Sequence, residues 1–204
     1  MELIGTNLTV VRGRKILFSD LSFSISSRNL LIVSGPNGSG KSTLLRVIAG
    51  LHQPLAGEVS KRGWTISLFS HYLNDKNAMK SNISVGKNLQ FWADWTGSVC
   101  PPLEVLKSVG LSCTLDVPFG LLSTGQKRRV ALARLLLVYR PLWILDEPIC
   151  ALDHEASSLF KSLMRHHLDS GGMIVAASHV SFEIGTPFMI RLPQGEKHEK
   201  ILYP

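Results

Sequence analysis

The sequence has few cysteines, few charged residues and no long apolar run, and each shortage excludes a class of protein. Cys100, Cys113 and Cys150 are odd in number and lack the close spacing of a zinc site, so neither a disulfide framework nor a structural metal is expected. The most apolar stretches, such as residues 130–138 and 173–177, are too short to span a membrane. The first residues lack the basic start and apolar core of a secretory signal, and we find neither an internal repeat nor a low-complexity segment.

The size and the charge of the chain leave several partners open. Its 204 residues, 45% of them hydrophobic, are enough for one core with a small additional subdomain. A mean hydropathy of +0.16 with only 18% charged residues suggests that a partner covers an apolar surface. The net charge of +7 fits nucleic acid, an anionic membrane surface or a phosphate-bearing ligand. The one dense basic run, residues 127–129, is interpreted as a solvated helix face.

Residues 35–42 fit the phosphate-binding pattern G-x-x-x-x-G-K-[ST] at every position, with a strand expected over 30–33 and a helix over 43–49. Glycines let consecutive backbone N–H groups face an anion, and the helix start adds partial positive charge. We expect Lys41 to reach the β- and γ-phosphates of a nucleotide and Ser42 to take one place on Mg²⁺. A glycine-rich turn that fits by chance is the alternative. The residues predicted to bind ATP here are Gly35, Pro36, Asn37, Gly38, Ser39, Gly40, Lys41, Ser42 and Thr43.

Strand and helix patterns alternate along the chain, which predicts an α/β fold. Strands are expected over residues 3–11, 21–25, 64–69, 142–145 and 173–177, with a turn at 12–15 between the first two. Residues 74–121 differ in character, with a helix at 88–92 capped by Ser84 and another at 103–109. We therefore predict one domain over 1–204, with a core of about 1–73 and 122–204 and a helical insertion of about 74–121.

Two further stretches predict chemistry at the phosphate. Ser123 and Gly125 form a second helix start that can hold an anion. Asp146 and Glu147 follow a buried strand, and sites in α/β proteins open beyond the carboxyl ends of strands. Adjacent strand residues point to opposite sides, so different roles are expected: Asp146 would hold Mg²⁺ and Glu147 would orient the attacking water. A solvated acidic turn is the alternative.

His179 stands at the end of the strand over 173–177, on the edge of the sheet where the phosphate loop and Glu147 are expected. A neutral imidazole there could donate a hydrogen bond to the γ-phosphate. The other histidines lack such a context and are predicted to be surface residues. They are His52, His154, His166, His167 and His198, apart from His71, which is treated below.

Five motifs follow one another along the chain: the phosphate loop, the LSTGQ segment, the strand with Asp146 and Glu147, the segment 151–153 and His179. In this order they resemble the motifs of the nucleotide-binding subunits of ABC transporters, and the resemblance covers about residues 8–192. The resemblance implies a RecA-like P-loop NTPase core with an antiparallel β edge and a helical subdomain. It also implies that two subunits close head to tail over two ATP molecules. Ser123 and Gly125, with Gln126 beside them, would then contact ATP bound by the opposite subunit, and Asp153 would lie at the dimer seam.

Within this family the chain is most similar to the ATP-binding subunit of the haem exporter of cytochrome c maturation. The resemblance rests on residues 12–19, 88–92, 126–135 and 142–148, and on His71, where most members have a glutamine that touches Mg²⁺. The segment 59–64 is shorter than usual, which puts the β edge in question. Val11 or Arg12 replaces the aromatic residue that stacks on adenine, so the Arg12 guanidinium could take that place.

This resemblance implies an ATP hydrolase coupled to transport, a translocase with ATP and Mg²⁺ as its ligands. It would act as a homodimer with integral membrane subunits, peripheral to the cytoplasmic face of the inner membrane, without nucleic acid and without direct haem contact. Two alternatives stay open: the ATPase of a transporter with another cargo, and a soluble ABC protein that acts on nucleic acid or ribosomes.

Overall fold

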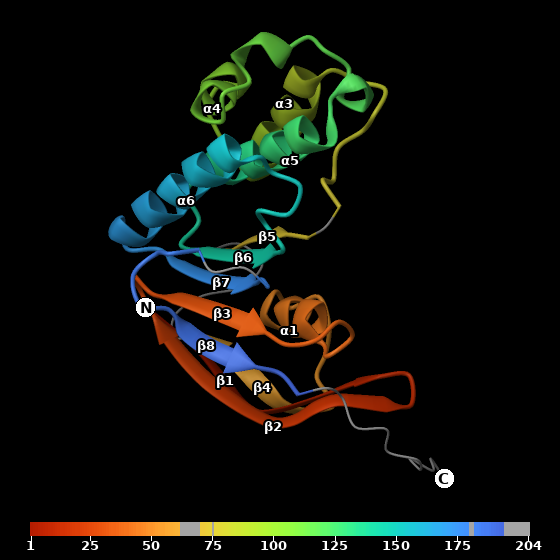
Figure 1. Cartoon of the computed structure of the whole chain (residues 1–204), viewed down its shortest axis with the longest axis vertical. Helices are drawn as coiled ribbons and strands as arrows, with labels where there is room; N and C mark the ends of the chain where they lie inside the picture. Colours follow the sequence, from red (N-terminus) through yellow and green to blue (C-terminus); the bar gives the residue numbers. More distant parts are fainter. Residues whose placement is uncertain (62–69, 75, 180–181, 194–204) are drawn as a thin grey trace. The chain divides into compact units, whose positions relative to one another are not determined.

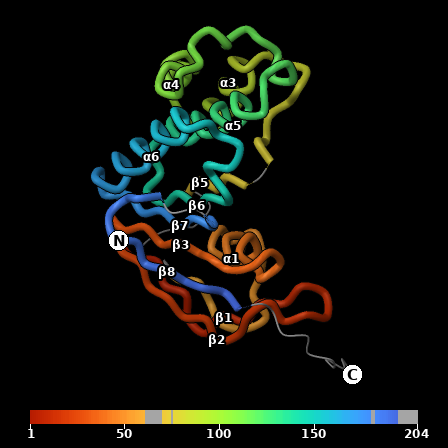
Figure 2. Tube along the Cα trace, viewed as in Figure 1, coloured from red at the N-terminus to blue at the C-terminus, as the bar shows by residue number. Residues whose placement is uncertain are grey.

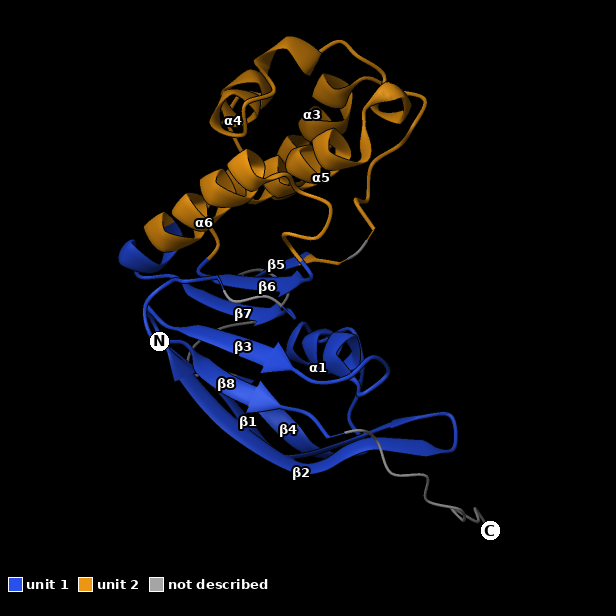
Figure 3. Ribbon diagram, viewed as in Figure 1, with its two compact units in different colours: residues 1–72, 141–147, 167–204 blue, residues 73–140, 148–166 orange. Residues whose placement is uncertain are grey.

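The computed structural model describes residues 1–61, 70–74, 76–179 and 182–193. The chain forms two compact units, which Figure 3 colours separately. Unit 1 contains residues 1–72, 141–147 and 167–204, and unit 2 contains residues 73–140 and 148–166. This division differs from the predicted core and insertion because residues 122–140 and 148–166 group with the helices. The predicted boundaries of the helical insertion, about residues 74 and 121, therefore remain a prediction.

An antiparallel sheet of unit 1 has the order β2-β1-β4, formed by β1 (Glu2–Arg12), β2 (Lys15–Ser26) and β4 (Ala56–Lys61). Arg12 pairs with Lys15 beside Gly13, whose φ of 62 suits a residue without a side chain. The strands predicted over 3–11 and 21–25 and the turn between them are confirmed. The pairing of β1 with β4 shows that the antiparallel sheet forms despite the short segment 59–64.

The second sheet of unit 1 has the order β5-β6-β7-β3-β8 (Figure 1). Its strands are β3 (Leu30–Ser34), β5 (Ser70–Leu73), β6 (Leu142–Asp146), β7 (Met173–Ala177) and β8 (Phe188–Arg191). The pairs β6–β7, β7–β3 and β3–β8 are parallel. Continuous apolar runs bury the central strands on both faces, as expected of parallel sheets. The carboxyl ends of β3, β7 and β6 therefore meet at one edge.

Helix α1 (Lys41–Ile48) follows β3 after the phosphate loop, and the chain trace in Figure 2 shows this strand–loop–helix path. Leu45 of α1 shares one buried core with Leu8 of β1 and Val33 of β3. This core ties both sheets of unit 1 to the helix that carries Lys41. Burial of such side chains stabilises a fold by about 1.5–3 kcal/mol each.

Unit 2 is built from helices. They are α3 (Val85–Thr96), α4 (Pro102–Ser108), α5 (Thr124–Ala133) and α6 (His154–Asp169, whose last turn lies in unit 1), with short 3₁₀ segments at Ser112–Thr114, Phe119–Leu121 and Arg134–Leu136. Val85, Leu89 and Ala93 repeat every four residues and face the core of this unit. Ser84 caps α3 by accepting from the Lys87 N–H, as predicted. In the part of the chain that the structure describes, no helix is both long and apolar enough to cross a membrane.

Two predictions about charged side chains were wrong. Arg128 is 5% exposed, so the basic run 127–129 is not a solvated face throughout. His167 is buried and stacks on Trp143 with ring centroids 4.1 Å apart. Both side chains have apolar or planar parts that pack well, which the sequence pattern does not report. The whole strand predicted over 64–69, and His198, lie outside the described residues.

Candidate functional site

The phosphate loop between β3 and α1 has a backbone that only glycines adopt easily. Gly35, Gly38 and Gly40 have φ values of 145, 80 and 102. A Cβ on Gly35 would lie 2.7 Å from the Leu192 carbonyl oxygen, so no side chain fits there. Gly40 is the N-cap of α1 and gives no side-chain cap bond, and the first turn has no acidic residue. The first N–H groups of α1 are therefore available to an anion.

The loop also positions two polar side chains that suit a polyphosphate. The Lys41 ammonium donates to the carbonyl oxygens of Gly35 at 2.8 Å and Pro36 at 3.2 Å, which folds it over the loop. The Ser39 Oγ is buried and has no hydrogen-bond partner among the described residues. A buried hydroxyl in this condition is costly and suits a site that a ligand completes. The residues present thus fit a phosphate group.

Asp146 and Glu147 come from the end of β6. Asp146, the last residue of the strand, is 7% exposed and lies opposite Ala177 in the parallel ladder. Glu147 has a left-handed backbone, with φ of 45, and its N–H donates to the Ala177 carbonyl oxygen at 3.0 Å. The expectation that the two side chains point to opposite sides was wrong, because Glu147 leaves the strand conformation. Both side chains line the same cavity.

His179 follows β7, the strand that pairs with β6. Its Nε2 lies 3.6 Å from Glu147 Oε1, and the two side chains are 50% and 33% exposed. This separation makes them neighbours at a distance longer than a hydrogen bond. The side chains of His179 and Glu147 both line one cavity.

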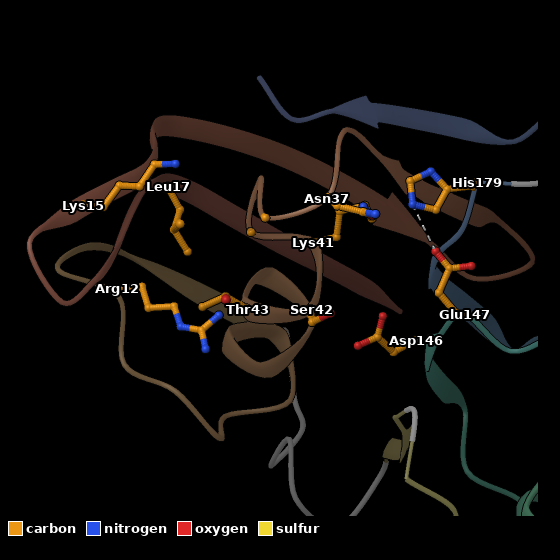
Figure 4. A pocket seen from close by; sticks show the side chains of 12 residues that line it. Arg12, Lys15, Leu17, Asn37, Lys41, Ser42, Thr43, Asp146, Glu147 and His179 are labelled. Atoms are coloured by element: carbon orange, nitrogen blue, oxygen red, sulfur yellow. Dashed lines mark ion pairs between the residues drawn. The ribbon is translucent and has the colours of Figure 1, made fainter. Parts of the chain in front are cut away.

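These residues surround a cavity of about 430 Å³ in unit 1 (Figure 4). The lining residues are Arg12, Lys15, Leu17, Asn37, Gly38, Gly40, Lys41, Ser42, Thr43, Asp146, Glu147 and His179. Figure 4 shows Arg12 and Lys15 at one end, the phosphate loop in the middle and Glu147 and His179 at the other end. Sequence reasoning missed Lys15 and Leu17, although the predicted turn at 12–15 pointed to this hairpin. The cavity has cations along the hairpin and the loop, and carboxylates beyond them.

The remaining predicted residues lie elsewhere. Gly35, Pro36 and Ser39 shape the loop without lining the cavity, and His71 is buried on β5 and does not line it either. Ser123, Gly125 and Gln126 belong to unit 2, at the start of α5. A capping box joins two of them: Ser123 Oγ accepts from the Gln126 N–H, and Gln126 Oε1 accepts from the Ser123 N–H. Asp153 Oδ1 caps α6 by accepting from the Ala156 N–H at 2.7 Å.

The cavity offers oxygen ligands for Mg²⁺ but no protein metal cage among the described residues. Among the described residues, no three His, Cys, Asp or Glu side chains gather as a metal site. Mg²⁺ commonly binds through one or two protein oxygens together with substrate phosphates and water. Ser42 and Asp146 both line the cavity and lie next to each other in Figure 4, so they offer such oxygens.

Comparisons with known proteins agree with this geometry. Residues 18–150 match the family model described as ABC transporter. The chain is 50% identical over 184 residues to a cytochrome c biogenesis ATP-binding export protein of Bartonella henselae, covering 88% of each chain. It is 47% identical over 208 residues to the protein of that name from Bartonella quintana, covering 98% of this chain and 100% of that one.

Solved structures show the same fold. An ABC transporter ATP-binding protein from Pyrococcus furiosus superposes with a TM-score of 0.80 at 26% identity, over 94% of this chain and 98% of that one. A bacterial Atm1-family ABC exporter with ATP bound gives a TM-score of 0.82 at 24% identity, over 97% of this chain and 38% of that one. The predicted ABC ATPase fold is thereby confirmed. This chain belongs to the ABC transporter family of ATP-binding proteins.

Proposed function

We propose that this chain is the ATPase subunit of a membrane haem exporter that serves the biogenesis of c-type cytochromes. The observation that carries the ATPase function is one cavity lined by Lys41, Asp146 and Glu147 together. The similarity to two proteins named for cytochrome c biogenesis and export supports the transport process. Haem as cargo rests on the sequence resemblance.

The phosphate loop would bind the triphosphate. The first N–H groups of α1 and the backbone of the loop would face the β- and γ-phosphates. The Lys41 ammonium would exchange the carbonyls of Gly35 and Pro36 for phosphate oxygens, which are stronger acceptors.

Ser42 and Asp146 would hold Mg²⁺ with the phosphates. The ion, when bound, neutralises charge that develops on the phosphate oxygens. His71, on β5, is the third predicted ligand. His71 is buried and does not line the cavity, so its position does not bring it to the proposed Mg²⁺.

Glu147 would orient the attacking water and accept its proton while the water oxygen bonds to the γ-phosphorus and ADP leaves. Its side chain is 33% exposed and borders the cavity. His179, on the same side, would donate a hydrogen bond from its imidazole to the γ-phosphate. Catalysis would then rest on positioning and charge, as is usual in phosphoryl transfer.

Each site would be completed by a second copy of the chain. Ser123, Gly125 and Gln126 of one copy would contact ATP in the cavity of the other, with Asp153 at the seam. Closure of this homodimer would drive integral membrane subunits, so the chain would lie at the cytoplasmic face of the inner membrane. Neither nucleic acid nor haem would bind to this chain itself.

Deletion of the gene in its own host tests this proposal, with complementation by the wild type and by Glu147→Gln. We expect membrane and periplasmic c-type cytochromes, detected by haem staining, to be lost and to return only with the wild type. Normal cytochromes after deletion would contradict haem export and leave another cargo to be identified from the membrane protein that co-purifies. Salt-sensitive binding to DNA or RNA at physiological ionic strength would support the nucleic-acid alternative instead.

A further inference from the structure

Hydrogen bonds from Arg128 of α5 join distant segments of unit 2. Its Nε donates to the Pro148 carbonyl oxygen at 3.1 Å, and its Nη1 donates to the Asn74 carbonyl oxygen at 2.7 Å. The side chain is 5% exposed. One planar guanidinium thus holds two backbone carbonyls from segments 20 and 54 residues away.

A buried charge at this position is costly. A guanidinium loses its hydration on burial, and an apolar side chain of similar size often stabilises a fold as well or better. A second buried guanidinium adds to the cost: burial and the charge of Arg128 lower the pKa of Arg134 to about 10. Arg134 makes a separate cation–π contact, with its Cζ 4.3 Å from the centroid of the Trp92 ring. Packing alone therefore does not explain a charged donor at residue 128.

The segment that Arg128 holds comes directly after the proposed catalytic carboxylate. Pro148 follows Glu147 in the chain, and Glu147 has the left-handed φ of 45, which is unfavourable for a residue with a side chain. On its N-terminal side, the Glu147 N–H donates to the Ala177 carbonyl oxygen. On its C-terminal side, Pro148 has no N–H to donate, so its carbonyl is the group by which a neighbour can fix it. Hydrogen bonds therefore hold the backbone on both sides of Glu147, through its own N–H and through the carbonyl of Pro148.

We propose that Arg128 is a positioning residue for Glu147. Its guanidinium, anchored on Asn74, fixes the carbonyl of Pro148 and with it the backbone that directs the Glu147 carboxylate. This role rests on the proposed function, because it matters only if Glu147 orients the attacking water. It predicts that changes at Arg128 reduce the rate of hydrolysis while nucleotide affinity is kept.

The test compares Arg128→Met, Arg128→Lys and the control Arg165→Met, an exposed arginine of α6 in the same unit. Each full chain is assayed with the membrane subunits that co-purify with it, for kcat, KM and ATP affinity. We expect Arg128→Met to lower kcat by about tenfold to a hundredfold, as small misplacements of catalytic groups do, with ATP affinity within about threefold. Arg128→Lys should recover part of the rate, because an ammonium donates but lacks the planar fork.

A folded Arg128→Met with the kcat of Arg165→Met would overturn the proposal, as would weaker ATP binding with an unchanged kcat. If Arg128→Met does not fold, Arg128→Lys decides: a lower kcat at normal affinity supports the role, and a wild-type kcat contradicts it. Failure of the proposed function looks different. In that case the wild type does not hydrolyse ATP, or Glu147→Gln hydrolyses it normally.

Discussion

Helices α1 and α5 both start at segments that contain glycine and serine, yet only α5 has a side-chain cap on its first turn. Helix α1 has Gly40 as its N-cap, with no side-chain hydrogen bond. Helix α5 has a full capping box between Ser123 and Gln126. The first therefore leaves its N–H groups to a ligand, whereas the capping box of the second already satisfies the N–H groups of Ser123 and Gln126.

The difference indicates two kinds of anion contact. At α1 the phosphates of the nucleotide would accept hydrogen bonds from N–H groups that no side chain caps. At α5 the Ser123 Oγ already accepts a hydrogen bond from the Gln126 N–H, but its own hydrogen is not used by the capping box. A capped α5 can thus present a preformed donor to a phosphate bound elsewhere. This is the arrangement that a head-to-tail dimer requires.

The largest effect is expected for Glu147→Gln, which keeps the shape of the side chain and removes its basicity. We predict that ATP hydrolysis falls by about a hundredfold or more, because general bases contribute 10²–10⁴-fold, while ATP binding at α1 is retained. Steady-state hydrolysis and equilibrium binding measure the two effects. Glu155→Gln, in the first turn of α6, serves as the control. Normal turnover by Glu147→Gln would show that the base is another group.

Lys41→Ala tests the open helix start directly. We predict ATP binding about a hundredfold weaker, because charge-assisted bonds to the phosphates are lost. Titration with a fluorescent ATP analogue measures the affinity, with Lys87→Ala on the exposed face of α3 as the matched variant. Unchanged affinity would contradict the assignment of the phosphate loop.

Ser123→Asp sharpens the comparison at α5. Aspartate caps helices about as well as serine, so we expect the thermal midpoint to stay near that of the wild type. The added negative charge would repel the γ-phosphate held by the other copy, and hydrolysis should fall by about thirtyfold. Ser84→Asp makes the same change at the N-cap of α3 and should leave hydrolysis unchanged. Equal rates of hydrolysis by Ser123→Asp and Ser84→Asp would contradict a role of α5 in the site.

The smallest effect concerns the hairpin end of the cavity. If the Arg12 guanidinium stacks on the base, Arg12→Ala should weaken ATP binding by about fivefold and leave the affinity for inorganic tripolyphosphate unchanged. Arg12→Tyr should restore ATP binding, and Arg14→Ala, in the exposed turn, is the control. Equal weakening of ATP and tripolyphosphate would instead make Arg12 a phosphate contact.

Sequence predicted the elements whose signals are local. The apolar runs of β3, β6 and β7 and the serine caps of α3 and α5 were confirmed within a few residues. The same patterns brought the phosphate loop, Asp146 and His179 to one edge, because they place each at the end of a parallel strand. The family and its fold followed from the order of these motifs.

The features that sequence did not predict depend on tertiary contacts. Strand β8 has Ile190 as its one buried residue, so its alternation is weak and only its pairing with β3 reveals it. The stretch 54–57 contains the proline and glycine typical of a turn, but Ala56 pairs with Thr9 of β1 and begins β4. The burial of Arg128 and the left-handed backbone of Glu147 depend on partners 20 or more residues away. No local pattern signals either.

The central claim is that the open helix start and the capped helix start act in the same site from different copies of the chain. Mixing Lys41→Ala with Ser123→Asp tests it, since each variant alone has two damaged sites per dimer. If sites form between copies, a mixed dimer has one intact site and one doubly damaged site. Random mixing should then restore roughly a quarter of wild-type hydrolysis. Activity no higher than the average of the separate variants would contradict the claim.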